Sequence, residues 1–151
     1  TDICQSITNS MFIDKLLAGK TARVFLSEST LRTLIYTPDA SRAMALLGNT
    51  PDAYDQTWHL PCDDDRLTYR QFIQLAAEVF GVPARHHVLN RWQLWLAGLV
   101  SSEARDAAEL LPRYAVDNIF VSDKFKKRFP DLPCTTCRDG LTAIRTSNPP
   151  A

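Results

Sequence analysis

The stretch Arg32-Thr33-Leu34-Ile35-Tyr36-Thr37-Pro38-Asp39-Ala40-Ser41-Arg42-Ala43 joins a strand pattern directly to a helix start. Residues 34–36 are β-branched or bulky and favour a strand. Residues 37–39 suit the N-cap, the first helical position and the first turn of a helix. We therefore expect a strand that passes into a helix with almost no loop. Arg32 and Arg42 flank this junction, where a guanidinium could hold a carboxylate or a phosphate.

Length and charge limit the classes of protein that fit. With 151 residues, 45% of them hydrophobic, the chain can form a single compact domain, which we place at residues 1–146 with a flexible tail at 147–151. Lysine plus arginine (17) equals aspartate plus glutamate (17), so no overall field favours nucleic acid as a partner. No apolar run approaches the ~20 residues of a membrane span, and no signal-peptide pattern is visible, so we expect no membrane partner. The four cysteines show no dense disulfide pattern, which favours a cytoplasmic setting.

The remaining patterns predict an α/β fold, in an α+β arrangement, that is rich in helices and has several short strands. The clearest signal is Thr68 with Gln71, a capping-box pair, followed by apolar residues at helical spacing up to Gly81. Residues 87–99 are apolar on more than one side and are expected to pack deeply or at an interface. Helices are expected over 8–18, 38–48, 68–80, 103–111, 123–128 and from 136 onward, and strands over 22–26, 34–36, 56–61 and 118–121.

The order of four sequence pieces resembles a known family. The pieces are Ser10-Met11-Phe12 through Ala18-Gly19-Lys20, the Arg32 to Ala43 junction, Thr57-Trp58-His59-Leu60-Pro61 with the Thr68 helix, and Phe120-Val121-Ser122-Asp123-Lys124 with Phe129-Pro130. Together they resemble the C-terminal, substrate-binding half of the NAD(P)-dependent epimerase/dehydratase family. These are extended short-chain dehydrogenases/reductases that act mostly on nucleotide sugars. The likeness runs through most of the chain.

The resemblance implies a substrate-binding role for two arginines. In that family the arginine that opens the strand of this junction contacts the diphosphate of a nucleotide-sugar substrate, and Arg32 occupies the matching position. A second phosphate-binding arginine precedes the late strand, and Arg113 is its nearest match. The implied partner is an anionic small molecule such as a nucleotide sugar. Guanidinium suits this role because its fork of donors matches phosphate oxygens and keeps its charge when partly buried.

The chain also departs from the family pattern. Its five glycines are scattered singly, so they form no glycine-rich dinucleotide fingerprint, and no tyrosine has a lysine four residues later. We therefore assign no catalytic, cofactor-binding or metal-binding residue here. The resemblance implies NAD or NADP for a full-length isomerase or oxidoreductase, held by a Rossmann half that is missing from this chain. The competing hypothesis is a non-catalytic module that associates with a partner chain or with itself, because strand edges and the apolar segment 92–100 could be exposed.

Cysteine and histidine patterns offer weaker alternatives. Cys134-Thr135-Thr136-Cys137 at a helix start could carry a reactive thiol or begin a metal site, but no second spaced pair of ligands accompanies it. The adjacent His86 and His87 point to opposite sides of an extended segment, which favours surface or partly buried histidines over a metal-binding pair or a general base. His59 is expected to complete a strand and to make one hydrogen bond.

Aromatic and charged runs have similarly plain interpretations. Trp92 and Trp95 could stack on a base or a sugar ring, but we favour a core or interface role. The acidic run 63–65 could bind a cation, although a solvated loop before a capped helix is the preferred interpretation. The basic run 124–128 is read as a solvated helix face, with Phe125 directed inward.

Overall fold

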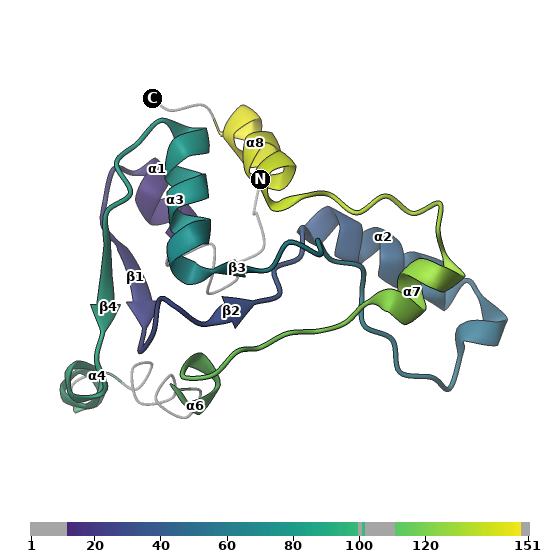
Figure 1. Cartoon of the computed structure of the whole chain (residues 1–151), viewed down its shortest axis with the longest axis horizontal. Coiled ribbons are helices and arrows are strands. Elements are labelled where there is room, and N and C mark those ends of the chain that lie inside the picture. Colours follow the sequence, from purple (N-terminus) through teal and green to yellow (C-terminus); the bar gives the residue numbers. More distant parts are fainter. Residues whose placement is uncertain (1–11, 100, 102–110, 149–151) are drawn as a thin grey trace.

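The computed structural model describes residues 12–99, 101 and 111–148, and it confirms a mixed arrangement of helices and short strands. Figure 1 shows α1, α3, α8, β1 and β4 gathered at one end of the molecule and α2 with α7 at the other, with β2 and β3 between them. The elements are α1 (Asp14–Leu17), β1 (Ala22–Phe25), β2 (Leu31–Arg32), α2 (Thr37–Gly48), the 3-10 helix η2 (Pro51–Ala53), β3 (Leu67–Thr68), α3 (Tyr69–Phe80), β4 (His86–Leu89), α4 (Arg91–Gly98), α6 (Leu111–Tyr114), α7 (Asp123–Arg128) and α8 (Cys137–Ser147).

Helix α3 carries the core and begins as its sequence predicts. The Thr68 hydroxyl accepts from the backbone N–H of Gln71 at 3.2 Å, and the Gln71 side chain accepts from the backbone N–H of Thr68 at 2.8 Å. Gly81 ends the helix with a φ of 71°, in the left-handed region that glycine adopts without strain. Both predicted ends of this helix are therefore confirmed.

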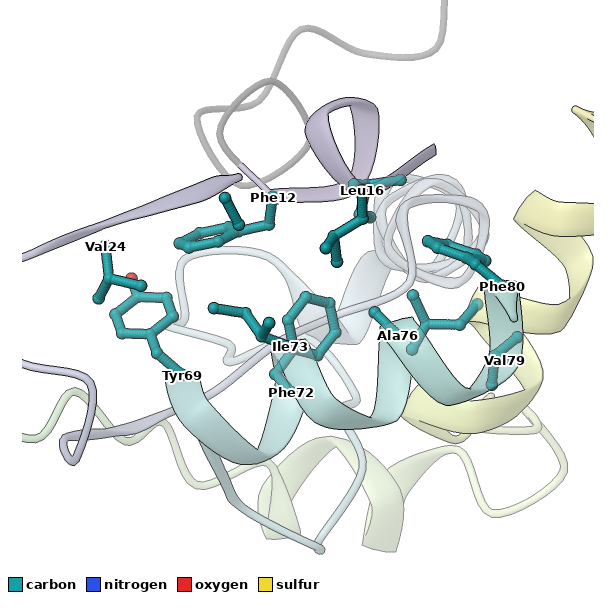
Figure 2. Close-up of a cluster of buried hydrophobic side chains, with 12 residues drawn as sticks. Phe12, Leu16, Val24, Tyr69, Phe72, Ile73, Ala76, Val79 and Phe80 are labelled. Atoms are coloured by element: carbon teal, nitrogen blue, oxygen red, sulfur yellow. The ribbon is translucent and has the colours of Figure 1, made fainter. Parts of the chain in front are cut away.

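The buried face of α3 packs against α1, β1 and α8. Figure 2 shows this cluster, with Tyr69 at one end beside Val24 and Phe80 at the other. Burying one such aliphatic side chain stabilises the fold by roughly 1.5–3 kcal/mol. The cluster comprises Phe12, Ile13, Leu16, Ala22, Val24, Tyr69, Phe72, Ile73, Ala76, Val79, Phe80 and Leu141.

Two small sheets position the chain around this core. Strand β1 pairs in parallel with β4, and β2 pairs antiparallel with β3, with Arg32 opposite Leu67. On the other side of β2, Arg32 forms a parallel bridge with Asn118. Arg32 is therefore the residue at which three segments that are distant in sequence meet.

The strand predicted at residues 34–36 is wrong. The strand lies at Leu31–Arg32, and residues 33–36 have no strand assignment. If the antiparallel pairing continued, residues 33 and 34 would lie opposite residues 66 and 65. The acidic loop bends at residues 64–65, so it offers no further strand for pairing. Because the partner strand is only two residues long, β2 cannot extend further. The helix start is confirmed within one residue, although its N-cap is Tyr36 rather than Thr37.

Other predicted elements differ in extent. The predicted strand at 56–61 is absent, and the one at 118–121 reduces to the bridge at Asn118. The predicted helix 103–111 lies outside the described residues except for Leu111, which begins α6. Pro112 is the second residue of α6, where the missing N–H of proline is tolerated. Of the predicted helix 8–18, residues 12 onward are described, and α1 covers Asp14–Leu17.

Candidate anion-binding site

Arg32 is a buried cation at the centre of the candidate site. Its side chain belongs to β2, and the residue is only 6% exposed. The Nη2 group donates a hydrogen bond of 2.6 Å to the backbone carbonyl of Arg113, in α6. Its buried Nε has no hydrogen-bond partner among the residues that the structure describes. The guanidinium therefore has a donor left over for an acceptor from outside this set.

Two tyrosine rings lie against this guanidinium. The Cζ atom of Arg32 is 5.3 Å from the ring centroid of Tyr69 and 5.2 Å from that of Tyr114. The two rings are stacked, with centroids 6.5 Å apart and planes inclined by 22°. The guanidinium lies over each ring, and because 6.5 Å is much less than the sum of the other two distances, it is not sandwiched between them. Each contact of this kind stabilises a cation by about 0.5–2 kcal/mol, depending on its exposure.

No carboxylate lies within ion-pair distance of Arg32 in the described part of the chain. The nearby Asp117 carboxylate accepts instead from the backbone N–H of Leu31, at 2.8 Å. Burial raises the pKa of the Tyr69 phenol, and the positive charge of Arg32 partly opposes that rise. Buried charges are ordinarily paired with an opposite charge. Arg32 is unusual because its guanidinium contacts two aromatic rings and one carbonyl instead.

A hollow of about 170 Å³ opens beside these groups. It is smaller than the roughly 300–1,000 Å³ of pockets that enclose whole drug-sized ligands, so it suits one anionic group of a ligand. The lining combines two arginines with aromatic and small polar side chains: Arg32, Thr33, Leu34, Tyr69, Arg113, Tyr114, Asn118 and Phe120.

The structure brings both sequence-predicted site residues together. Arg32 and Arg113 are 81 positions apart, yet both line the hollow and one bonds to the backbone of the other. Arg42, the second arginine at the junction, is not among the lining residues and is paired with the buried Asp39. Sequence reasoning missed Tyr69 and Tyr114. Their positions directly after the Thr68 cap and directly after Arg113 were the available signals, but no local pattern links the two tyrosines.

The Cys-x-x-Cys segment has the environment of unreactive thiols. Cys137 begins α8, and its backbone N–H donates to the Asp63 carboxylate at 3.0 Å. Burial, together with the Asp63 and Asp65 carboxylates, raises the pKa of Cys137 to about 11. Burial also raises the pKa of Cys134. Both thiols therefore stay protonated near neutral pH, and within the described ranges no group of three side chains could hold a metal ion.

The histidines have separate surroundings. The ring Nε2 of His86 hydrogen-bonds to the Glu28 carboxylate, which also accepts from Arg70. His87, on the opposite side of β4, is exposed, as predicted from the alternation of an extended segment. His59 makes the single expected hydrogen bond, 2.9 Å from Nδ1 to the carbonyl of Val121, but it does not belong to a strand.

The aromatic and basic segments differ in burial. Trp92 and Trp95 of α4 are 61% and 65% exposed, so the prediction of deep packing is wrong for both, and the interface role stays a prediction. Phe125 is buried as expected. The basic run of α7 is paired with acidic loops, through Lys126 to Asp64 at 2.6 Å and Arg128 to Asp52 at 2.8 Å.

Comparison of the chain with protein-family models, with curated proteins and with solved structures finds no match. In the described residues, no helix combines the length and the apolar character needed to cross a membrane. The geometry around Arg32 therefore carries the functional argument.

Proposed function

We propose that this chain is the substrate-binding portion of an NAD(P)-dependent epimerase/dehydratase-like oxidoreductase, in which Arg32 and Arg113 bind the diphosphate of a nucleotide sugar. The observation that supports it most is the buried Arg32 guanidinium, whose Nε–H has no partner among the described residues and which lines a hollow together with a second arginine. The resemblance of the sequence to the C-terminal half of that family supplies the substrate class.

The energetics of a buried cation favour an anionic ligand. Removing a guanidinium from water without a counter-charge is unfavourable, and an unsatisfied buried donor adds a further penalty of about 1–3 kcal/mol. A phosphate oxygen at the Nε–H would satisfy that donor and supply the opposite charge. The volume of about 170 Å³ leaves room for the charged group, while the rest of a nucleotide sugar would extend beyond the hollow.

This role concerns binding and not turnover. Proton and hydride transfer would need the nicotinamide cofactor and the tyrosine–lysine pair that the resemblance places in a nucleotide-binding half. We expect the present chain to bind the substrate and to be inactive without that half. A cytoplasmic location belongs to the same proposal, because the spacing of the four cysteines is not that of a dense disulfide pattern.

Calorimetry of the isolated chain tests the proposal, with UDP-glucose, UDP and uridine as ligands. We expect the two phosphate-bearing ligands to bind and uridine to bind far more weakly. Replacing Arg32 by methionine should lower affinity by about 10–100-fold, the equivalent of one charge-assisted hydrogen bond. Arg138→Met is the matched control, because Arg138 is exposed, pairs with Glu78 and does not line the hollow.

A negative result with the isolated chain calls for the same titration after a nucleotide-binding half has been restored. Absence of UDP binding in both forms would exclude the proposal. Equal affinity of the parent chain and Arg32→Met would exclude Arg32 as the binding residue.

The alternative function, a non-catalytic interaction module, rests on helix α4. This eight-residue helix exposes three large apolar side chains along its length and a fourth just beyond its end, and such a cluster is typical of a protein–protein contact. The exposed residues are Trp92, Trp95, Leu96 and Leu99. Light scattering tests self-association: a dimer that Trp95→Glu dissociates would favour this function, whereas a monomer that binds UDP would count against it.

A further inference from the structure

We infer that the rings of Tyr69 and Tyr114 are positioning elements that fix the guanidinium of Arg32 for its ligand, an arrangement called here the tyrosine clamp. The inference rests on the proposed function, since it explains how the same arginine is prepared to bind a diphosphate. It assigns the task to the aromatic rings and not to the phenolic hydroxyls.

The clamp consists of three contacts to one guanidinium group. Two rings lie at 5.3 and 5.2 Å from the guanidinium carbon, and the Arg113 carbonyl accepts from Nη2 at 2.6 Å. A guanidinium restrained in this way has already lost the rotational freedom that an exposed arginine loses when it binds a ligand. The clamp therefore favours binding by preorganisation.

The hydrophobic core holds the rings in place without a ligand. Tyr69 is buried and stacks on Phe12 with ring centroids 5.2 Å apart. Tyr114 meets Phe25 edge to face, also at 5.2 Å. Figure 2 shows Tyr69 as the end member of the buried cluster on α3. Since both rings are anchored in apolar packing, they set the place of Arg32 and not the reverse.

The hydrogen bond that Arg32 makes to the Arg113 carbonyl leaves the Nε–H of the guanidinium available to a ligand. Nη2 is engaged by a backbone carbonyl, so the side chain of Arg113 is not used to hold Arg32. That second guanidinium is exposed and lines the hollow, and it can approach the same anion. A lysine at position 32 would lack the planar fork that lies against the rings and presents Nε–H, so Arg32→Lys should behave like a loss of function despite its charge.

The two roles of a tyrosine can be separated by paired substitutions. Tyr69→Phe and Tyr114→Phe keep the ring and remove the hydroxyl, whereas Tyr69→Leu and Tyr114→Leu remove the ring. The clamp predicts near-parental behaviour of both phenylalanine variants. It predicts weaker binding of inorganic pyrophosphate by about fivefold in each leucine variant, as expected for the loss of one cation–π contact.

The first measurement needs no ligand and uses the NMR signal of the Arg32 Nε–H. We expect this signal to be shifted upfield by the adjacent rings and protected from exchange with water, in the parent chain and in both phenylalanine variants. Each leucine variant should lose part of the shift. Tyr114→Leu, at a half-buried position, keeps the test available if Tyr69→Leu does not fold. An unshifted, rapidly exchanging signal in the parent chain would overturn the clamp.

The second measurement is the calorimetric affinity of the same variants for pyrophosphate. Loss of the NMR signature with unchanged affinity would overturn the positioning role. Weaker binding in the phenylalanine variants, equal to that of the leucine variants, would assign the effect to the hydroxyls and would also overturn it. A parent chain with the intact NMR signature that binds neither pyrophosphate nor UDP, both in isolation and with a nucleotide-binding half restored, would refute the proposed function, and with it the positioning of Arg32 for a ligand.

Discussion

The two ends of helix α3 differ in whether the groups packed against them find all of their interaction partners within the described residues. From Phe72 to Phe80 the inward side chains belong to one hydrophobic cluster, and Ile73 and Ala76 are fully buried. At the first residue, Tyr69, the same helix meets a buried cation with an unpartnered N–H. The apolar end is therefore satisfied by packing within the chain. At the other end, the guanidinium keeps one N–H donor for which the described residues supply no acceptor.

The interactions at the two ends respond to different changes. Apolar packing depends on volume and shape, so any loss of atoms weakens the folded state. The energy of a polar hollow depends on the pairing of charges, so its contribution to the stability of the folded state changes when a ligand binds or when the pH changes. Substitutions at the two ends should therefore affect different measurements.

Truncation in the apolar end should have the largest effect on stability. Ile73→Ala should lower the free energy of unfolding by about 2–5 kcal/mol, because a fully buried site cannot collapse around the cavity. Urea denaturation measures this change. Gln74→Ala, at the neighbouring exposed position of α3, is the control and should change stability by less than about 0.5 kcal/mol. A small effect of Ile73→Ala would place the core elsewhere.

Removing the cation should affect ligand-induced stability instead. With pyrophosphate at about one hundred times its dissociation constant, the parent chain should gain about 2.7 kcal/mol. At the same pyrophosphate concentration Arg32→Met, with an affinity about 10–100-fold lower, should gain only about 0.4–1.4 kcal/mol. Its stability without ligand should stay near the parental value because an unpaired buried charge has been removed. Thermal unfolding with and without pyrophosphate measures both quantities. A large loss of ligand-free stability in Arg32→Met would show that Arg32 is needed mainly for folding.

The cap between the two ends should have an intermediate effect. Thr68→Ala removes the acceptor of the 3.2 Å bond from the Gln71 N–H and should lower stability by about 1 kcal/mol. Since Tyr69 is the next residue, fraying of this turn should also weaken pyrophosphate binding. Thr146→Ala, near the end of α8, is the matched control. If a destabilised Thr68→Ala variant bound pyrophosphate as well as the parent chain, ligand binding at the hollow would not depend on the first turn of α3.

The smallest effect should come from the titration of Tyr69. Burial raises the pKa of this phenol in the folded chain, so the folded state keeps its proton where the unfolded state has lost it. The corresponding stability is fully present below about pH 10, the ordinary tyrosine pKa, and declines as the pH rises above it. Tyr69→Phe should remove this part of the decline. Urea denaturation between about pH 8 and pH 11 measures the difference, and parallel curves for the two chains would contradict it.

Local patterns were sufficient where one element contains all of its own signals. The cap at Thr68, the apolar spacing of α3 and the left-handed Gly81 lie within a single stretch, and the structure confirms each of them. The predictions at residues 34–36 and 56–61 were wrong because a strand needs a partner, and the sequence does not show which segment will lie opposite.

The candidate site shows the same division. The sequence pointed to Arg32 and Arg113 through a resemblance, and the structure places both at one hollow. The two tyrosines could not be inferred, because their relation to Arg32 arises from β2, α3 and α6 meeting in space.

The sequence by itself determined where α2, α3, α7 and α8 begin and which residues carry charge, since capping and apolar spacing act over a few neighbouring positions. Only the tertiary structure decided that Arg32 is buried against two rings, with one N–H that finds no partner among the described residues, and that Trp92 and Trp95 are exposed. The physical reason is that burial and pairing depend on contacts between residues far apart in the chain, and these are fixed only when the whole core packs.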